Sequence, residues 1–257
     1  MILIDGDIVA YKCAYKAQDD RPKYAAYTAS SYLSDLISDL YVKLKDEPDY
    51  LVYLSGRSEG NFRHKHAVTA GYKENRKDKE KPKHLSVIRD HLIENWNAIV
   101  STDCEADDLI ATAATETKGS VIVSVDKDFD QIPGLHYNPN KKELYNVSEE
   151  EAVRFLYEQI LTGDRVDNII GIYGVGPVKA RKVLAECSTE LEMFEKCVEM
   201  YEGSRERVIE NARLLYLRRA EGELWMPPNK IPPYVGTPRD PKHIYDKYLE
   251  AEESCDV

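Results

Sequence analysis

The sequence feature that most constrains the fold is a set of short apolar segments without alternation. Met1–Ile4, Leu51–Leu54 and most of Ser120–Val125 are apolar at successive positions rather than at every second one. Such strands are buried on both faces, as in a parallel sheet covered by helices. Apolar residues at helical spacing between them, as over Tyr32–Leu44, supply the covering layer. The sequence therefore predicts an α/β fold with a mostly parallel sheet.

Capping signals and apolar spacing predict further elements. These are a helix over Leu85–Asn95, a strand near Ala98–Val100, a helix opened by a capping box at Thr102 and Glu105, a hairpin of Leu135–Tyr137 and Glu143–Val147, and a helix from Ser148 to about Thr162. After the first strand, Asp5-Gly6-Asp7 predicts an acidic turn.

From Gly163 the pattern changes to helices and turns, with no strand candidate. Helices are expected from Pro177 to about Glu186, over Glu190–Tyr201 and over Arg205–Glu221, and an irregular acidic tail from Pro227. We therefore expect a catalytic unit over 1–162, a helical unit over 163–226 and a tail over 227–257.

Charge is distributed unevenly along the chain. The formal net charge is −11, so nucleic acid could bind only at a local basic patch. Between Arg57 and Lys83, nine basic residues stand against four acidic ones, directly after a predicted strand. This segment either overhangs the edge of the sheet and faces DNA, or is a solvated charged loop.

The cysteines and the apolar segments exclude several classes of protein. The five cysteines are scattered without a CxxC pair, which argues against a disulfide framework or a zinc cluster and favours reduced thiols in the cytoplasm. Asp5 and Asp7 interrupt any signal peptide. No apolar run approaches the roughly 18 residues of a membrane-spanning helix, so no membrane partner is expected.

Four acidic motifs are candidates for a metal site. They are Asp5-x-Asp7, Glu105-x-Asp107-Asp108, Asp126-x-Asp128 and Asp164-x-x-Asp167. Each alone could be a helix or turn cap. Because Asp5 and Asp126 follow buried strands, however, both should lie at the carboxyl edge of the sheet, where ligands bind. Clustered carboxylates favour Mg²⁺ or Mn²⁺, and two such ions about 3.5–4 Å apart suit phosphodiester hydrolysis.

A glycine-rich turn precedes the first helix of the helical unit. Gly171 to Gly176 leads into Pro177, and Lys179 and Lys182 follow on the helix. Backbone N–H groups of such a turn can approach a phosphate, and the helix N-terminus adds a favourable dipole. The alternative is a tight turn without a ligand.

Taken together, these motifs make the chain resemble the flap endonuclease-like 5′-nucleases, most closely the bacteriophage 5′→3′ exonucleases. The motifs that carry the resemblance are Asp5-Gly6-Asp7, Tyr72-Lys73-x-x-Arg76, Glu105-Ala106-Asp107-Asp108, Asp126-Lys127-Asp128-Phe129, and Gly163-Asp164-x-x-Asp167-Asn168 followed by Gly174-Val175-Gly176. They stand in the family's order and span about two thirds of the chain.

The resemblance implies a PIN-like (Rossmann-like) catalytic domain, a helical arch at about 57–95 and a helix–three-turn–helix module. It implies two Mg²⁺ or Mn²⁺ ions held by Asp5, Glu105, Asp107, Asp126, Asp164 and Asp167, with Asp108 and Asp128 close by. It makes Lys73 and Arg76 catalytic, and Tyr72, Gly174, Val175, Gly176, Lys179 and Lys182 DNA-binding, with a K⁺ at the hairpin. One position departs from the family, because Ser55-Gly56 stands where Asp-Gly is usual. Ser55 supplies no charge, and Asp7 either compensates or is a turn residue.

The expected function is a divalent-metal-dependent 5′→3′ exonuclease or flap endonuclease that hydrolyses double-stranded or branched DNA. The partner is then duplex DNA with a 5′ end or flap, and the setting is phage DNA replication in the host cytoplasm. A PIN-like ribonuclease and a non-catalytic DNA-structure-binding protein remain the alternatives.

Overall fold

The computed structural model describes residues 1–56, 60–77 and 79–228. Six strands form the main sheet, in the order β3-β2-β1-β4-β5-β6. Their bounds are β1 Ile2–Asp5, β2 Tyr50–Leu54, β3 Ile99–Val100, β4 Val121–Val123, β5 Gly134–Asn138 and β6 Glu143–Val147. All neighbouring pairs are parallel except β5 and β6, which form an antiparallel hairpin. The predicted mostly parallel sheet is thus confirmed.

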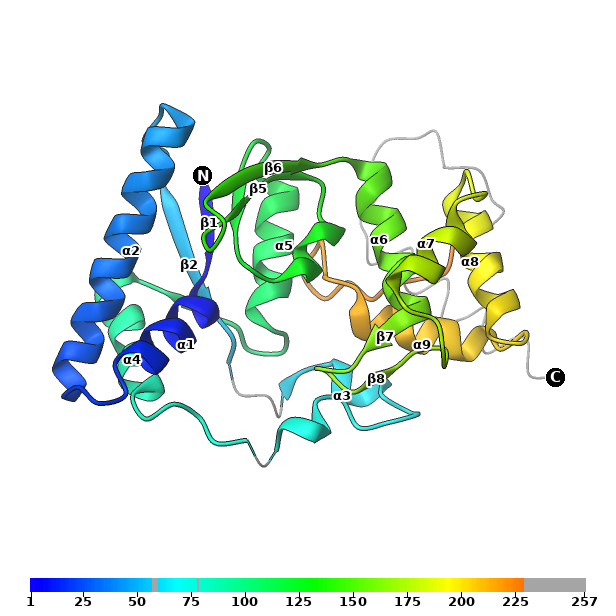
Figure 1. The fold of residues 1–257 in the computed structure, drawn as a ribbon, viewed down its shortest axis with the longest axis horizontal. Helices are drawn as coiled ribbons and strands as arrows, with labels where there is room; N and C mark the ends of the chain where they lie inside the picture. The colour runs from blue at the N-terminus through cyan, green and yellow to red at the C-terminus, as the bar shows by residue number, and fades with distance from the viewer. Residues whose placement is uncertain (57–59, 78, 229–257) are drawn as a thin grey trace.

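Helices cover both faces of this sheet, which explains why the central strands β1, β2 and β4 are mostly apolar. Helices α1 (Gly6–Lys16), α2 (Pro22–Leu44) and α4 (Leu85–Trp96) pack together on one face, and α5 (Ala106–Glu116) covers the other (Figure 1). Successive side chains of β1 point to opposite faces of the sheet. Ile2 and Ile4 pack in the core under α1, α2 and α4, whereas Leu3 packs in the core under α5.

Four further helices, α6 (Glu149–Thr162), α7 (Pro177–Leu184), α8 (Glu190–Met200) and α9 (Arg205–Leu215), share a separate apolar core on the right of Figure 1. Helix α6, placed with the first unit by the sequence, packs against the other three. Ser148 caps it as predicted, and Pro177 opens α7. The division of the chain at Gly163 stays a prediction.

The local predictions were wrong at four places. Asp5-Gly6-Asp7 is not a turn, because Asp5 caps α1 directly. The capping box of α5 joins Glu105 to Asp108 rather than Thr102 to Glu105. After α6 the chain forms the two-residue strands β7 (Gly163–Asp164) and β8 (Ile169–Ile170), which are too short for a periodicity signal. Helix α9 ends at Leu215 and not at Glu221.

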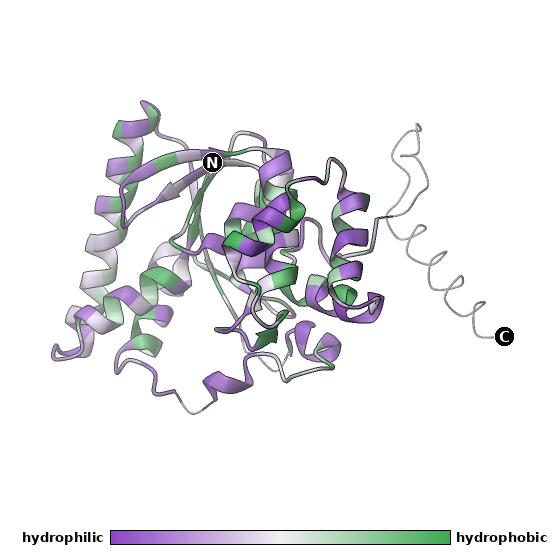
Figure 2. Cartoon of the chain, turned by 45° about the vertical axis from the view of Figure 1, so that its right-hand side comes forward, coloured by the Kyte–Doolittle hydropathy of each residue, from purple (hydrophilic) through white to green (hydrophobic). Residues whose placement is uncertain are grey.

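The segment between β2 and α4 is the basic part of the chain, and Figure 2 colours most of it as hydrophilic. Its described residues form the short helix α3 (Arg63–His66) and a 3₁₀ turn at Glu74–Arg76 before α4 begins. Residues 57–59 and 78 of the expected arch, and 229–257 of the expected tail, lie outside the described residues. Within the described part of the chain, no helix has the length and hydrophobicity needed to cross a bilayer.

Candidate active site

The acidic motifs meet at the carboxyl edge of the central strands. Asp5 ends β1 and is buried, and its carboxylate accepts hydrogen bonds from the backbone N–H groups of Asp7 and Ile8, at 3.1 Å each. The hydroxyl of Ser124, just after β4, donates to the same carboxylate at 2.9 Å. These bonds hold Asp5 in place while it caps α1.

The carboxylates of this edge repel one another. Burial and the charges of Asp7 and Asp126 raise the pKa of Asp5 to about 7. Burial and the charge of Asp126 likewise raise the pKa of Asp128 to about 7, although Gln159 donates a hydrogen bond to it at 2.7 Å. Burial and the charges of Asp5, Glu105 and Asp126 raise the pKa of Asp107 well above its ordinary value. Negative charge is therefore concentrated here.

Salt bridges neutralise only some of the described carboxylates, among them Glu105 and Asp167. Among the described residues, no salt bridge reaches Asp5, Asp107, Asp126 or Asp128. A small cavity of about 20 Å³ lies between Glu105, Asp107, Asp128 and Asp167, which is room for a water molecule or an ion. In the described ranges, no three acidic, histidine or cysteine side chains are arranged to hold a metal ion as they stand.

Glu105 and Asp167 face the basic segment instead. The ammonium group of Lys73 contacts Glu105 and lies 3.5 Å from Asp167, and the guanidinium group of Arg76 contacts Asp167. The hydroxyl of Tyr72 lies 2.8 Å from a Glu105 oxygen and 3.0 Å from an Asp167 oxygen, and its one hydrogen is shared between the two carboxylates. Burial alone would raise the pKa of Glu105, but Lys73 and Arg63 outweigh it and lower that pKa.

Main-chain bonds fix this arrangement between segments distant in the sequence. The backbone N–H of Lys73 donates to the carbonyl of Asp167 at 2.9 Å, and the side chain of Asn168 donates to the carbonyl of Gly71 at 2.9 Å. The β7–β8 hairpin therefore lies against the segment before α4 (Figure 1). Asp164 lies in this hairpin, where its carboxylate accepts the N–H of Val166 at 2.6 Å.

Asp108 is placed differently from the other predicted ligands. Its two oxygens accept a bidentate pair of hydrogen bonds from Arg63, at 2.6 and 2.9 Å, and both side chains are buried. They also accept the backbone N–H groups of Glu105 and Arg218. The structure thus corrects the prediction that Asp108 is a metal ligand. Its charge is neutralised by Arg63, and both of its oxygens accept hydrogen bonds within the protein.

Two residues predicted to bind DNA have side chains that are buried in the helical core. This corrects the prediction for the Tyr72 side chain, whereas Val175 lies in a turn that is expected to act through backbone N–H groups, and its role stays a prediction. Tyr72 is 4% exposed and Val175 is 6% exposed. Around Val175 the turn is open: Gly174 has a positive φ of 73°, while Gly176 is extended and has open space where a Cβ would stand. Lys179 and Lys182 on α7 are exposed as expected for a contact with DNA.

Ser55 and Asp7 are joined by hydrogen bonds to each other and to their neighbours. The Ser55 hydroxyl accepts the N–H of Ala106 at 2.9 Å, and its own N–H donates to Asp7 at 2.9 Å. Arg89, on α4, contacts both the Asp7 carboxylate and the Ser55 carbonyl. Asp7 is therefore paired with a cation, which the sequence could not reveal because Arg89 is 82 positions away.

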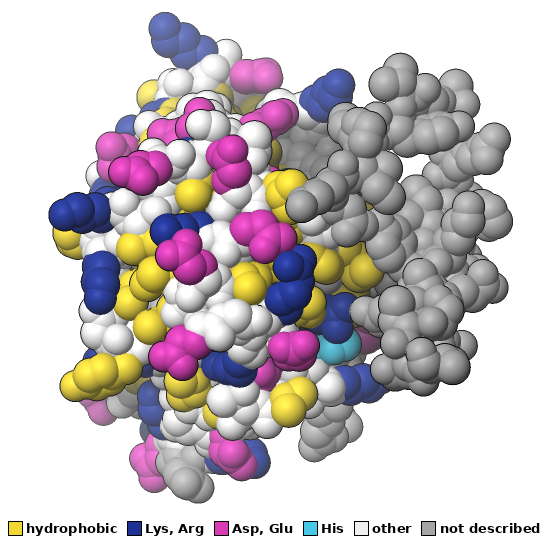
Figure 3. All heavy atoms as spheres, turned by 90° about the vertical axis from the view of Figure 1, so that its right-hand side faces the viewer, with side chains coloured by type: hydrophobic (Ala, Val, Ile, Leu, Met, Phe, Trp, Pro, Cys, Tyr) yellow, Lys and Arg dark blue, Asp and Glu magenta, His cyan; other side chains and the backbone are white. Residues whose placement is uncertain are grey.

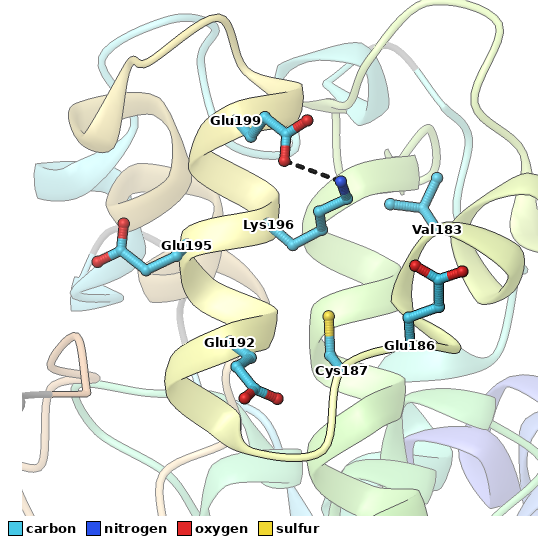
Figure 4. A pocket seen from close by; sticks show the side chains of 7 residues that line it. All are labelled: Val183, Glu186, Cys187, Glu192, Glu195, Lys196 and Glu199. Atoms are coloured by element: carbon cyan, nitrogen blue, oxygen red, sulfur yellow. Dashed lines mark hydrogen bonds and ion pairs between the residues drawn. The ribbon is translucent and has the colours of Figure 1, made fainter.

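A larger hollow of about 320 Å³ lies between α7 and α8 (Figure 4). Glutamates dominate its lining, but Glu199 bonds Lys196, Glu195 bonds Arg205, and Glu192 caps its own helix. These pairings are structural, so the groove is a weaker candidate than the smaller acidic cavity.

Asp128→Asn is expected to stabilise the protein at alkaline pH by about 1 kcal/mol or more. Because the folded pKa of Asp128 is raised from 3.8 to about 7, the folded protein retains a proton that the unfolded chain releases. Stability is therefore lost as pH rises from about 4 to 7, and asparagine removes this loss. Urea unfolding should show the gain at pH 8 and little of it at pH 4. Asp19→Asn, on an exposed loop, is the control, and equal behaviour of the two variants would contradict the prediction.

Known proteins with similar sequences include exonucleases and flap endonucleases. A family model described as the 5′-3′ exonuclease N-terminal, resolvase-like domain matches residues 1–157. DNA polymerase I of Rhizobium leguminosarum is 32% identical over 139 residues, which are 49% of this chain and 14% of the polymerase. Flap endonuclease Xni of Shewanella sp. (strain W3-18-1) is 32% identical over 138 residues, which are 48% of this chain and 53% of that protein. The matched part is thus about half of the flap endonuclease.

Solved structures share the fold at lower identity. T5 5′-exonuclease with bound divalent zinc ions aligns with a TM-score of 0.64 and 19% identity, over 84% of this chain and 88% of that one. A complex of the bacteriophage T5 D15 flap endonuclease with DNA and metal ions aligns with a TM-score of 0.62 and 19% identity, over 83% and 88%. Because the family model covers more than half of the sequence, the resemblance is confirmed: the chain belongs to the family of the 5′-3′ exonuclease N-terminal, resolvase-like domain.

Proposed function

We propose that this protein is a divalent-metal-dependent 5′-nuclease that hydrolyses phosphodiester bonds in double-stranded or branched DNA. The observation that carries the proposal is the cluster of uncompensated carboxylates at the sheet edge, directly beside Lys73 and Arg76. The negative charge of the cluster repels a phosphate. A divalent cation bound to the carboxylates would make the site attractive to a phosphate instead. Membership of the nuclease family supports the proposal.

The donor set fits hard divalent cations. Asp5, Asp107, Asp126 and Asp128 offer oxygen ligands, and the raised pKa values of Asp5, Asp107 and Asp128 would fall again beside a positive ion. We assign the first ion to Asp5, Glu105, Asp107 and Asp126, and the second to Asp164 and Asp167, with Asp128 nearby. Bound ions would neutralise the phosphate charge and would lower the pKa of a bound water, which makes that water a better nucleophile. Three points stay predictions: that the divalent ion in the cell is Mg²⁺, that two such ions bind, and that a K⁺ binds at the hairpin.

Lys73 and Arg76 have the charge and position to act on the substrate. Both are partly exposed, at 23% and 38% of their side-chain surface, at the margin of the acidic cavity. There they can bind a phosphate oxygen and stabilise the charge that develops on it during hydrolysis. The tight ion pairs also keep Lys73 protonated, because its pKa is raised by Glu105 and Asp167 against the effect of burial.

Duplex binding is assigned to the turn at Gly174–Gly176 and the first turns of α7. Open space at Gly174 and Gly176 lets a DNA backbone approach closely. Cationic and anionic side chains are interspersed on the visible part of the face in Figure 3, which is the side of the molecule where α6 to α9 lie. A local contact is therefore a better explanation of DNA binding than the overall field of the protein.

Lys179→Ala combined with Lys182→Ala should weaken duplex binding similarly for all sequences. Both side chains are exposed, so the fold should not change. The salt dependence of binding should flatten by about one to two units of log–log slope, because up to two phosphate contacts are lost. Fluorescence anisotropy over a salt series measures this. Lys118→Ala with Lys141→Ala removes the same charge outside the turn, and equal effects of the two pairs would remove the assignment.

The test of the function is product mapping on labelled 5′-flap, nicked, blunt and RNA–DNA substrates, with Mg²⁺, Mn²⁺ or a chelator. Metal-dependent cleavage near the 5′ end of DNA is the expected result. Cleavage of RNA alone would establish a ribonuclease, and metal-independent binding without cleavage would establish a structure-binding protein. Phage replication in the host cytoplasm stays a prediction for the biological setting.

A further inference from the structure

The carboxylates that bind Lys73 and Arg76 belong to the set that the proposed metal ions need. Lys73 contacts Glu105 and lies 3.5 Å from Asp167, and Arg76 contacts Asp167. The Tyr72 hydroxyl also lies within hydrogen-bonding distance of both carboxylates. An oxygen that bonds an ammonium group is a poor ligand for a divalent cation, because the two positive charges would repel each other strongly in a partly buried site.

The backbone around these two cations is fixed, whereas their side chains are not enclosed. Besides the bond from the Lys73 N–H to Asp167, the side chain of Asn75 donates to the carbonyl of Arg165 at 2.7 Å. The Lys73 and Arg76 side chains are 23% and 38% exposed. Arg76 also donates from Nε to the carbonyl of Val166 at 2.8 Å. Rotation of the two side chains, with loss of this one further bond, turns them away from the carboxylates and toward a phosphate outside.

We propose that Lys73 and Arg76 are internal counter-ions of the metal site, and that metal binding at Glu105 and Asp167 transfers them to the phosphate of bound DNA. The inference rests on the proposed function. Metal and DNA then bind cooperatively: the ion displaces the two cations, and the phosphate accepts them. By linkage, DNA tightens metal binding by the same factor by which metal tightens DNA binding.

The coupling predicts an unusual effect of removing Lys73. Without DNA, Lys73→Met should bind Mn²⁺ more tightly than the unchanged chain, by about tenfold, within the usual range of coupling between two sites. Lys77→Met is the matched control, because Lys77 is exposed and bonds only Glu74 among the described acidic residues. The two variants lose the same net charge, so any effect of net charge alone on Mn²⁺ binding is the same in both, and the difference between them reports the position of Lys73. Free Mn²⁺ is measured by electron paramagnetic resonance on the full chain.

A second arm adds a 5′-flap duplex with phosphorothioate linkages that resist hydrolysis. The duplex should tighten Mn²⁺ binding by the unchanged chain and by Lys77→Met, and much less by Lys73→Met. Arg76→Met, which loses the other counter-ion, should behave like Lys73→Met. Equal Mn²⁺ affinity of Lys73→Met and Lys77→Met would overturn this inference while leaving the nuclease proposal intact. Failure of every variant to bind Mn²⁺ would overturn both.

Discussion

Replacing Arg63 by methionine should lower the free energy of unfolding by about 3–5 kcal/mol, which is the usual result of breaking a buried ion pair on one side. Arg63 and Asp108 are only 2% and 1% exposed. The guanidinium group also donates to the carbonyls of Leu214 and Tyr216, both at 2.9 Å. Methionine fills part of the volume but leaves the Asp108 carboxylate buried with only backbone N–H partners. Urea unfolding at pH 7 measures the loss.

A double-mutant cycle separates the ion pair from packing. Asp108→Asn keeps the shape and an oxygen that can accept the N–H groups of Glu105 and Arg218, and it removes the charge. Combined with Arg63→Met, it should cost much less than the sum of the two single variants, because no uncompensated charge remains. A loss below about 1 kcal/mol for Arg63→Met, or simple additivity, would show that the pair does not hold these segments together.

This ion pair marks the limit of what could be predicted from the sequence. Ser148 and Pro177 were placed correctly because a cap or a first helical turn depends on neighbouring residues. The central strands β1, β2 and β4 could be predicted because burial on both faces leaves a local apolar run. Arg63 instead joins Asp108, 45 positions away, and the end of α9, about 150 positions away. Within a basic segment it could not be distinguished from the cations that face solvent.

The candidate site shows the same division. Asp5 and Asp126 could be assigned to one edge because parallel strands fix where their carboxyl ends lie. The pairing of Asp7 with Arg89 and of Glu105 with Lys73 depends on side-chain contacts between distant segments. Tyr72 belongs to a recognisable motif, but the motif does not say which way the ring points. In the structure its ring is buried and only its hydroxyl reaches the acidic residues.

Asp126→Asn combined with Asp128→Asn should lower the single-turnover rate of DNA cleavage by about a thousandfold or more, comparable with the loss of a central electrostatic group in other enzymes. Asp126 follows β4 and caps the short 3₁₀ turn at Lys127–Gln131, where its side chain accepts the N–H of Asp128 at 3.0 Å. Asparagine keeps that oxygen, so the turn should remain. Two charges disappear from the carboxylate cluster, and with them the attraction for a divalent cation.

Because the double change removes charge and keeps the shape, the cleavage rate should fall while DNA affinity and stability do not. In the presence of a chelator, without divalent cations, the double variant should bind duplex DNA at least as tightly as the unchanged chain, since repulsion between the phosphate and the cluster is reduced, and it should be more stable at pH 8 for the same reason as Asp128→Asn. Asp130→Asn, in the same turn, is the matched control: its carboxylate accepts the Tyr145 hydroxyl at 2.9 Å, on the β5–β6 hairpin. Single-turnover rates and anisotropy on one flap substrate separate the two effects. A double variant that cleaves at the rate of Asp130→Asn would exclude Asp126 and Asp128 from the metal site, and one that loses DNA binding and stability together would show that the pair serves the fold.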